Sequence, residues 1–259
     1  MDVEYAKILQ LWRSYRVKTE ADIDLRLHNF RILFAFNSGK IENQRITYQQ
    51  TREIFENGRV QGFTGDPRTL FEQQNQKLCY EFLKPLIVRQ APLSLDLIRE
   101  VHRILTGGTY DERRFVELGE RPGEFKKHDF VTGEAEVGSL PEDVATDLQD
   151  LLDDLAENEG QDVLKLAAYF HLRFEYIHPF ADGNGRVGRT LLNYYLMTHA
   201  YPPTIIHESE KDGYYAALRQ YDQNEDCEPM HAFLMAQTVK TWAKALARAD
   251  RRERSGQLG

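Results

Sequence analysis

Residues 178–189 read HPFADGNGRVGR and lie between two stretches whose apolar residues follow a helical period. In residues 162–177 the apolar side chains recur at steps of three and four, which places them along one stripe of a helix. Pro179 and the glycines after it keep the next residues out of a helix. We therefore predict a helix that ends near Ile177, a short loop, and a second helix that begins around Arg186.

The same helical period dominates the rest of the chain. It recurs in residues 70–88, 95–105, 144–155, 187–197 and 230–246. Asp66 and Ser94 precede two of these stretches and are predicted helix caps. Residues 107–140 break the pattern with glycine, proline and short alternating apolar runs, so we expect a long loop there with a β-hairpin at 125–131 that turns at 132–134. The predicted fold class is all-α, with this one hairpin beside the helical core.

The composition is that of an acidic globular protein. Apolar residues make up 41% and charged residues 29%, and the formal charge is −8, which disfavours general binding to nucleic acid or to anionic membranes. No apolar run approaches the roughly 20 residues that span a bilayer, and the N-terminus has no secretory signal. Cys79 and Cys227 are too few for a disulfide scaffold. We expect a soluble, cytoplasmic protein.

The loop itself has the composition of an anion-binding site. Gly183, Asn184 and Gly185 leave several backbone N–H groups free just before a helix, whose positive dipole end lies behind them. Arg186 and Arg189 are three residues apart and share one face of that helix. Both guanidinium groups can therefore reach a polyphosphate held in the loop.

Other side chains of the loop supply reactive groups. Asp182 offers one oxygen ligand, which suits a Mg²⁺ ion that takes its other ligands from phosphates and water. His178 has a reference pKa of about 6.5 and can accept a proton from a hydroxyl. His171 stands two helical turns before it, about 10.5 Å along the axis, which is too far for both imidazoles to share one metal ion. We interpret the loop as a nucleotide-phosphate site, His171 as a packed histidine and Phe180 as a buried anchor.

The loop also resembles the signature of the Fic family, His-x-Phe-x-Asp/Glu-Gly-Asn-Gly-Arg-x-x-Arg. Every specified position is filled, by His178, Phe180, Asp182, Gly183, Asn184, Gly185, Arg186 and Arg189. The resemblance extends from about Phe34 to the last predicted helix. It implies a helical Fic core with a β-hairpin flap next to the active site. A turn-rich stretch at 58–67 predicts a division into an N-terminal helical segment at 1–65 and a catalytic core at 66–250, and the polar composition of residues 251–259 predicts a flexible tail.

The family resemblance implies a Mg²⁺-dependent nucleotidyltransferase that moves AMP from ATP onto a Ser, Thr or Tyr hydroxyl of a protein, which can be the chain itself. His178 would take the proton of the attacking hydroxyl, and Asp182 would hold Mg²⁺. The amides of residues 183–185 would cradle the β-phosphate beside Arg186, and Arg189 would take the γ-phosphate.

A target-binding flap and an adenosine pocket are also implied by the resemblance. The flap would comprise Thr132, Gly133, Glu134, Ala135 and Glu136, and would align a target segment by strand-like pairing. Tyr214 and Asp222 would line the adenosine pocket. Relatives that phosphorylate their targets carry Lys where this chain has Gly185, so nucleotide transfer is favoured over phosphate transfer.

Residues 38–43, SGKIEN, resemble the family's inhibitory motif, Ser/Thr-x-x-x-Glu-Gly/Asn, in the version that precedes the catalytic core. The resemblance implies that Glu42 pairs with Arg189 and so occupies the guanidinium that should receive the γ-phosphate. Ser38 would cap or position the short helix, and Asn43 would hold it near the site. We call residues 38–43 the inhibitory segment.

Several alternatives stay open at this stage. Glu42 could instead position a water that removes AMP, which would make the chain a bifunctional enzyme or mainly a de-AMPylase. A non-catalytic nucleotide-sensing module predicts a missing chemical residue, and none is missing. A homodimer is plausible because relatives with this inhibitory motif often pair.

Overall fold

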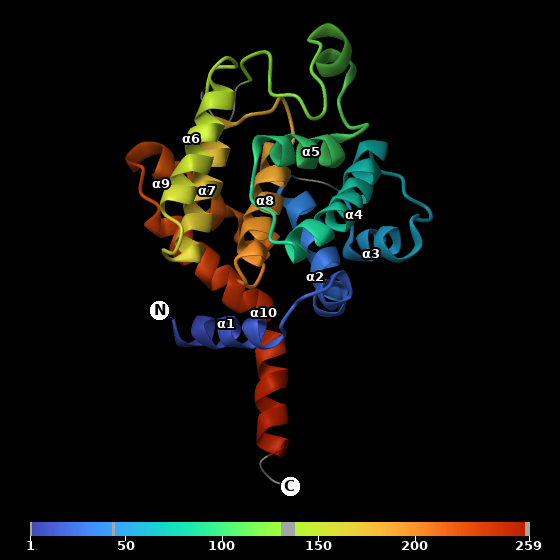
Figure 1. The fold of residues 1–259 in the computed structure, drawn as a ribbon. Helices are drawn as coiled ribbons and strands as arrows, with labels where there is room; N and C mark the ends of the chain where they lie inside the picture. The colour runs from blue at the N-terminus through green and yellow to red at the C-terminus, as the bar shows by residue number, and fades with distance from the viewer. Residues whose placement is uncertain (1, 43–44, 131–137, 257–259) are drawn as a thin grey trace.

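The computed structural model of the 259-residue chain describes residues 2–42, 45–130 and 138–256, and every regular element within these residues is helical (Figure 1). The α-helices are α1 (Val3–Ser14), α2 (Glu20–Ile41), α3 (Tyr48–Asn57), α4 (Pro67–Val88), α5 (Leu95–Thr106), α6 (Val144–Glu157), α7 (Val163–Ile177), α8 (Asn184–Thr198), α9 (Lys211–Asn224) and α10 (Glu228–Gly256). Two short helical turns, η1 (Arg113–Glu117) and η2 (Glu208–Glu210), complete the set.

The helix boundaries follow the local signals of the sequence. The predicted end of the helix before the loop, Ile177, is confirmed as the end of α7, and α8 begins at Asn184, slightly earlier than predicted. Asp66 caps α4 by accepting a hydrogen bond from the Arg68 N–H, and Ser94 caps α5 in the same way. Among the helices whose ranges were predicted, α10 differs most from its prediction, because it continues to Gly256, well past the end of the apolar pattern at 246.

The predicted β-hairpin is not present in the described residues. Residues 125–130 form no strand, and the residues expected to turn, 132–136, lie outside the described part of the chain. The Lys126 N–H donates to the Pro179 carbonyl over 2.9 Å, and the Lys127 N–H donates to the Glu120 carboxylate over 3.0 Å. The backbone N–H groups of this segment therefore donate to the signature loop and to the Glu120 side chain. In a β-hairpin they would donate to a neighbouring strand instead.

The core is built around α7 and α8, which pack against each other at the centre of the molecule (Figure 1). Nearly every side chain of α8 is buried, and α7 is apolar on most of its circumference, as expected for helices covered on all sides. Helix α5 contacts α8, and α6, α9 and α10 contact α7. The loop between α7 and α8 is thus held by the two most enclosed helices of the fold.

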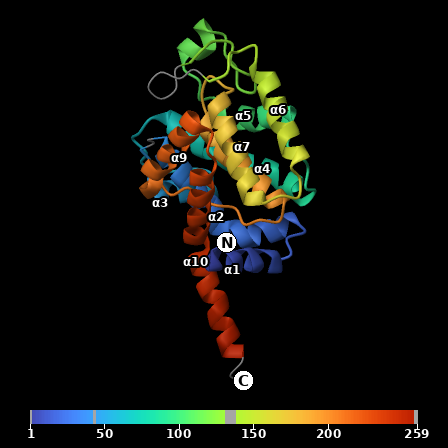
Figure 2. The same ribbon diagram turned by 90° about the vertical axis from the view of Figure 1, so that its left-hand side faces the viewer.

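Two peripheral helices pack on this core in different ways. Helix α1 lies across α10 (Figure 2). The rings of Trp12 and Trp242 meet edge to face between them, with centroids 5.3 Å apart. The C-terminal end of α10 projects away from the body in both views. Helix α2 packs on α4 and α8, which brings its C-terminal end to the signature loop.

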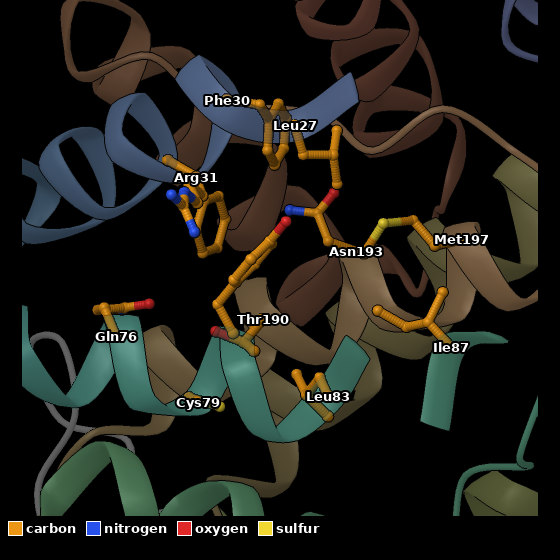
Figure 3. A pocket seen from close by; sticks show the side chains of 12 residues that line it. Leu27, Phe30, Arg31, Gln76, Cys79, Leu83, Ile87, Thr190, Asn193 and Met197 are labelled. Carbon is orange, nitrogen blue, oxygen red and sulfur yellow. The ribbon is translucent and has the colours of Figure 1, made fainter. Parts of the chain in front are cut away.

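A small cavity of about 40 Å³ remains beneath α2, between α4 and α8 (Figure 3). Leu27 and Phe30 from α2 face Leu83 from α4 across it, and Met197 from α8 closes one side. Its walls are almost entirely apolar. The underside of the helix that carries the inhibitory segment is therefore incompletely filled.

None of the helices within the described residues combines the length and the apolar character needed to cross a membrane.

Candidate active site

The signature loop is fixed by its own side chains. His178 ends α7 in a left-handed conformation, with φ of 50°, and turns the chain out of the helix. Asn184 then clamps the loop, because its side-chain oxygen accepts from the Phe180 N–H over 2.9 Å and its amide donates to the Phe180 carbonyl over 2.7 Å. Asn184 thus holds the loop through its side chain, a contact that the sequence interpretation did not include.

Phe180 anchors the loop in the core. Its ring is fully buried and stacks on the imidazole of His102 in α5, with centroids 3.7 Å apart and planes 4° apart. His102 Nδ1 accepts from the Gly123 N–H over 2.8 Å, so Nε2 carries the proton and donates to the Asp182 carbonyl over 3.0 Å. Burial lowers the pKa of His102 to about 3, which keeps this bridge neutral.

The two glycines of the loop lie in close contact with neighbouring side chains. Gly183 has φ of 85°, and a Cβ there would meet the Thr106 methyl at 2.6 Å. A Cβ on Gly185 would lie 2.5 Å from Glu42 Oε1 and 2.8 Å from Arg189 Nη1. The Glu42 carboxylate therefore stands directly over the N-terminal turn of α8, at the place where an anion is favoured.

The side chain of Arg189 makes three hydrogen bonds to the inhibitory segment. Its Nη2 donates to Glu42 Oε1 over 2.7 Å and to the Ser38 carbonyl over 3.2 Å, while Nε donates to Ser38 Oγ over 3.0 Å. Arg189 is 2% exposed. Burial alone would lower the pKa of Arg189, but the neighbouring Glu42 charge raises it above its usual value. Asn43 lies outside the described residues.

Asp182 and Arg186 belong to a second charged cluster that includes two residues of α4. Arg68 Nη2 donates to Asp182 Oδ2, and Arg68 Nε donates to Glu72 Oε1 over 2.9 Å. Arg186 Nη1 lies 3.0 Å from the same Glu72 oxygen, and its Nη2 lies 3.7 Å from Asp182 Oδ1. The sequence interpretation missed Arg68 and Glu72, whose only signal is an i,i+4 charge pair that is common on helix surfaces.

His178 is a neutral imidazole in this structure. Burial and then the charge of Lys126 lower its pKa to about 4, against the opposing effect of its hydrogen bond to the Glu175 backbone carbonyl. The ring nitrogen that donates to this carbonyl must carry the proton, so the other nitrogen has a free lone pair. The site thus offers a neutral base at ordinary pH.

His171, Tyr214 and Glu175 lie close enough to Arg189 to interact with its charge. His171 is fully buried with Nε2 2.8 Å from the Tyr214 hydroxyl, so it is a packed histidine, as its spacing predicts. Tyr214 is 1% exposed, and Asp222 is on the same helix, α9. Burial raises the pKa of Glu175 to about 7, with Arg189 opposing and Glu42 and Asp222 adding to the rise.

The Asp182 carboxylate suits a divalent cation that takes most of its ligands from substrate phosphates and water. The Asp182 side chain keeps 20% of its surface exposed, while Oδ2 accepts from Arg68 and Oδ1 accepts from the Gly183 N–H, so an ion bound to this carboxylate would replace or share these partners. In the described part of the chain no group of three His, Cys, Asp or Glu side chains is arranged to hold a metal by itself. A Mg²⁺ ion bound by one carboxylate together with substrate phosphates and water matches this arrangement.

The flap residues Thr132–Glu136 lie outside the described residues.

Comparison with known proteins agrees with the resemblance seen in the loop. The model of the Fic/DOC family matches residues 92–196, a segment that contains the whole signature loop. A protein adenylyltransferase Fic from Drosophila persimilis is 31% identical over 209 residues, which cover 80% of this chain and 39% of that protein. The chain belongs to the Fic/DOC family. It spans about two fifths of the length of the curated Fic relatives that it matches.

Solved structures share the Fic fold along nearly the whole chain. A Fic-domain-containing signaling protein from Bacteroides thetaiotaomicron superposes with a TM-score of 0.81 at 24% identity, covering 95% of this chain and 97% of that one. A Fic family protein from Desulfovibrio desulfuricans gives a TM-score of 0.74 at 26% identity, over 96% of this chain and 76% of that one. The shared fold thus extends well beyond the residues 92–196 that the family model matches.

Proposed function

We propose that this Fic protein is a protein adenylyltransferase that transfers AMP from ATP to a hydroxyl side chain of a protein and is autoinhibited by Glu42. The observation that carries the proposal is the Glu42–Arg189 pair, 2.7 Å long, at the N-terminal turn of α8. A carboxylate at this position marks an anion site. The name of the Drosophila relatives, protein adenylyltransferase, supplies the reaction class.

The proposed reaction is a displacement at the α-phosphorus of ATP. The target hydroxyl oxygen forms a bond to that phosphorus, the bond to the β-phosphate oxygen breaks, and pyrophosphate leaves. His178 accepts the hydroxyl proton at its unprotonated nitrogen. The backbone amides of the loop and Arg186 would hold the β-phosphate, and Arg189, once free of Glu42, would hold the γ-phosphate.

Asp182 would hold a Mg²⁺ ion whose charge neutralises the phosphates. Tyr214 and Asp222 on α9 would border the adenosine, and residues 132–136 would align the target segment.

In the proposed autoinhibition, Glu42 and the γ-phosphate of ATP compete for the guanidinium of Arg189. Arg189 makes three hydrogen bonds to Glu42 and Ser38 in the free protein, and a γ-phosphate must replace them. A charge-assisted pair of this kind is worth about 1.5–3 kcal/mol. ATP therefore binds weakly, or in a pose without its γ-phosphate contact, until α2 shifts.

The experiment that tests the proposed reaction is label transfer from ATP in the Glu42→Gly variant. We expect transfer of label from α-labelled ATP to protein and none from γ-labelled ATP. Transfer from γ-labelled ATP alone would make the protein a kinase and overturn the proposal. His178→Ala in the same background is the control, and it should bind ATP without transferring label.

A second candidate function uses the same Glu42 to position a water that removes AMP from a modified target. It is favoured by the 38% exposure of the Glu42 side chain, which leaves the carboxylate open to solvent while Oε1 binds Arg189. Incubation of a modified target with the wild-type protein, followed by intact mass, separates the two functions. Loss of AMP that Glu42→Gln prevents would establish removal.

A further inference from the structure

A second arginine contact at the signature loop has no role in the reaction outlined above. Arg68 lies in the first turn of α4, where Asp66 caps the helix, and its Nη2 donates to Asp182 Oδ2. Asp182 is the carboxylate that would hold the divalent cation. One of its two oxygens is therefore already taken by a guanidinium of the protein.

Glu72, one turn further along α4, holds Arg68 from the other side. Its Oε1 accepts from Arg68 Nε over 2.9 Å and lies 3.0 Å from Arg186 Nη1. The Glu72 side chain is only 7% exposed and that of Arg186 only 3%, whereas that of Arg68 keeps 34% of its surface open. Glu72 thus fixes two guanidinium groups side by side, with Arg68 the outer and more accessible one.

We propose that Arg68 is a phosphate-binding residue of this site, which exchanges the Asp182 carboxylate for a phosphate oxygen when ATP and a divalent cation bind. The inference rests on the proposed function in that ATP is taken as the ligand.

The charges of the cluster make this exchange favourable. Two guanidinium groups, Arg68 and Arg186, balance two carboxylates, Glu72 and Asp182, in the free protein. A divalent cation on Asp182 would stand next to the Arg68 guanidinium, and like charges at such a distance repel. The triphosphate brings the negative oxygens that replace Asp182 as the partner of Arg68.

The hydrogen bond from Arg68 Nε to Glu72 limits how far the Arg68 guanidinium can move during the exchange. Because Glu72 binds Arg68 through Nε, the Nη groups can change partner while the rest of the side chain stays in place. The new partner must therefore lie close to Asp182 and Arg186, which is where the phosphates are expected. A residue with this reach would discriminate a triphosphate from a monophosphate.

The test is titration calorimetry with Mg²⁺ in the Glu42→Gly background, comparing ATP with AMP. We expect Arg68→Ala to weaken ATP binding about tenfold and to leave AMP binding within about twofold. Arg52→Ala is the matched control, since Arg52 also donates through Nε to a glutamate four residues on, Glu56, and lies in α3, which packs on α2 and α4. It should change neither affinity.

The results that overturn the inference are specific. Unchanged ATP affinity in Arg68→Ala would leave Arg68 with only a structural role, and increased affinity would make it a competitor of the cation. AMP binding reports that the variant is folded, and Arg68→Gln repeats the test with a longer side chain.

The measurement also separates the two proposals. ATP binding that depends on Arg68 without label transfer would overturn the transferase and keep the phosphate contact. Absence of ATP binding in the Glu42→Gly parent would overturn both.

Discussion

The carboxylate of Glu42 lies 2.7 Å from the guanidinium of Arg189, although 147 residues of chain separate them. Ser38, one turn earlier in α2, receives two more hydrogen bonds from the same guanidinium. Helix α2 reaches the loop because it packs on α4 and α8. A buried arginine beside the N-terminal turn of α8 is thus already paired, and an anionic ligand of Arg189 would have to compete with Glu42 and Ser38.

The contributions of Glu42 and Ser38 to this pairing should differ. Glu42→Gln keeps the shape of the side chain and removes its charge, so we expect ATP affinity to rise about tenfold or more. Ser38→Ala removes one hydrogen bond from the guanidinium to an uncharged hydroxyl, and we expect a rise of about fivefold. Ser14→Ala, at the exposed end of α1, is the control and should have no effect. Calorimetric titration with ATP and Mg²⁺ measures all three, and equal effects of the two test variants would contradict the account.

The pH dependence of AMP transfer should reflect the neutral state of His178. Because burial and Lys126 lower its pKa to about 4, the base stays unprotonated as the pH falls from 8 to 5. In the Glu42→Gly background we therefore expect kcat/KM to show no acid limb above pH 5. His178→Ala should lower transfer by about 10²–10⁴-fold with ATP affinity within about twofold. An acid limb centred near 6.5 would show that His178 titrates as an exposed imidazole.

Glu175 should make the stability of the protein depend on pH. Its pKa is raised from 4.5 to about 7 in the folded chain, so between these values the folded state keeps a proton that the unfolded state has lost. The stability that this proton contributes is complete below pH 4.5 and disappears as the pH rises through 7.

The sign of this effect can be tested with Glu175→Gln. The Tm of the variant relative to wild type should rise by about 2–4 °C between pH 5 and pH 8. Glu157→Gln, on the exposed face of α6, is the matched control. A Tm difference that stays constant with pH would mean that Glu175 is ionised in the folded protein.

The packing of α2 over the cavity should contribute to the free energy of unfolding. Leu27 is fully buried and lines the cavity, whereas Leu25 on the same helix is 70% exposed. Leu27→Ala should enlarge the cavity and lower the free energy of unfolding by about 3 kcal/mol, and Leu25→Ala should change it by less than about 0.5 kcal/mol. Urea denaturation measures both. Similar losses would mean that the cavity wall collapses or that α2 contributes little.

The parts of the fold that local sequence determines could be predicted. The end of α7 at Ile177 follows from Pro179 and the left-handed turn at His178, and the caps Asp66 and Ser94 follow from their residue types. The signature loop was found because its residues are contiguous. The interpretation of the loop as a nucleotide-phosphate site therefore needs no knowledge of the packing, and it stays a prediction.

The contacts that arise from tertiary packing could not be predicted. Arg68 and Glu72 meet Asp182 and Arg186 only because α4 packs on α8, and the stacking of His102 on Phe180 joins α5 to the loop. A single sequence shows these residues as ordinary helix positions. The hairpin prediction was wrong for residues 125–130, which form no strand. It rested on a short alternation of apolar and polar residues, which does not reveal that the Lys126 N–H donates to the Pro179 carbonyl.

The measurement that tests the central claim most directly is the intact mass of the Glu42→Gly variant after incubation with ATP and Mg²⁺, beside wild type and Glu42→Gly/His178→Ala. The account predicts a gain of one AMP or more in the single variant, little gain in wild type and none in the double variant. An unchanged mass in the single variant, with ATP binding detected by calorimetry, would contradict self-directed AMP transfer. An equal gain in wild type would contradict inhibition by Glu42.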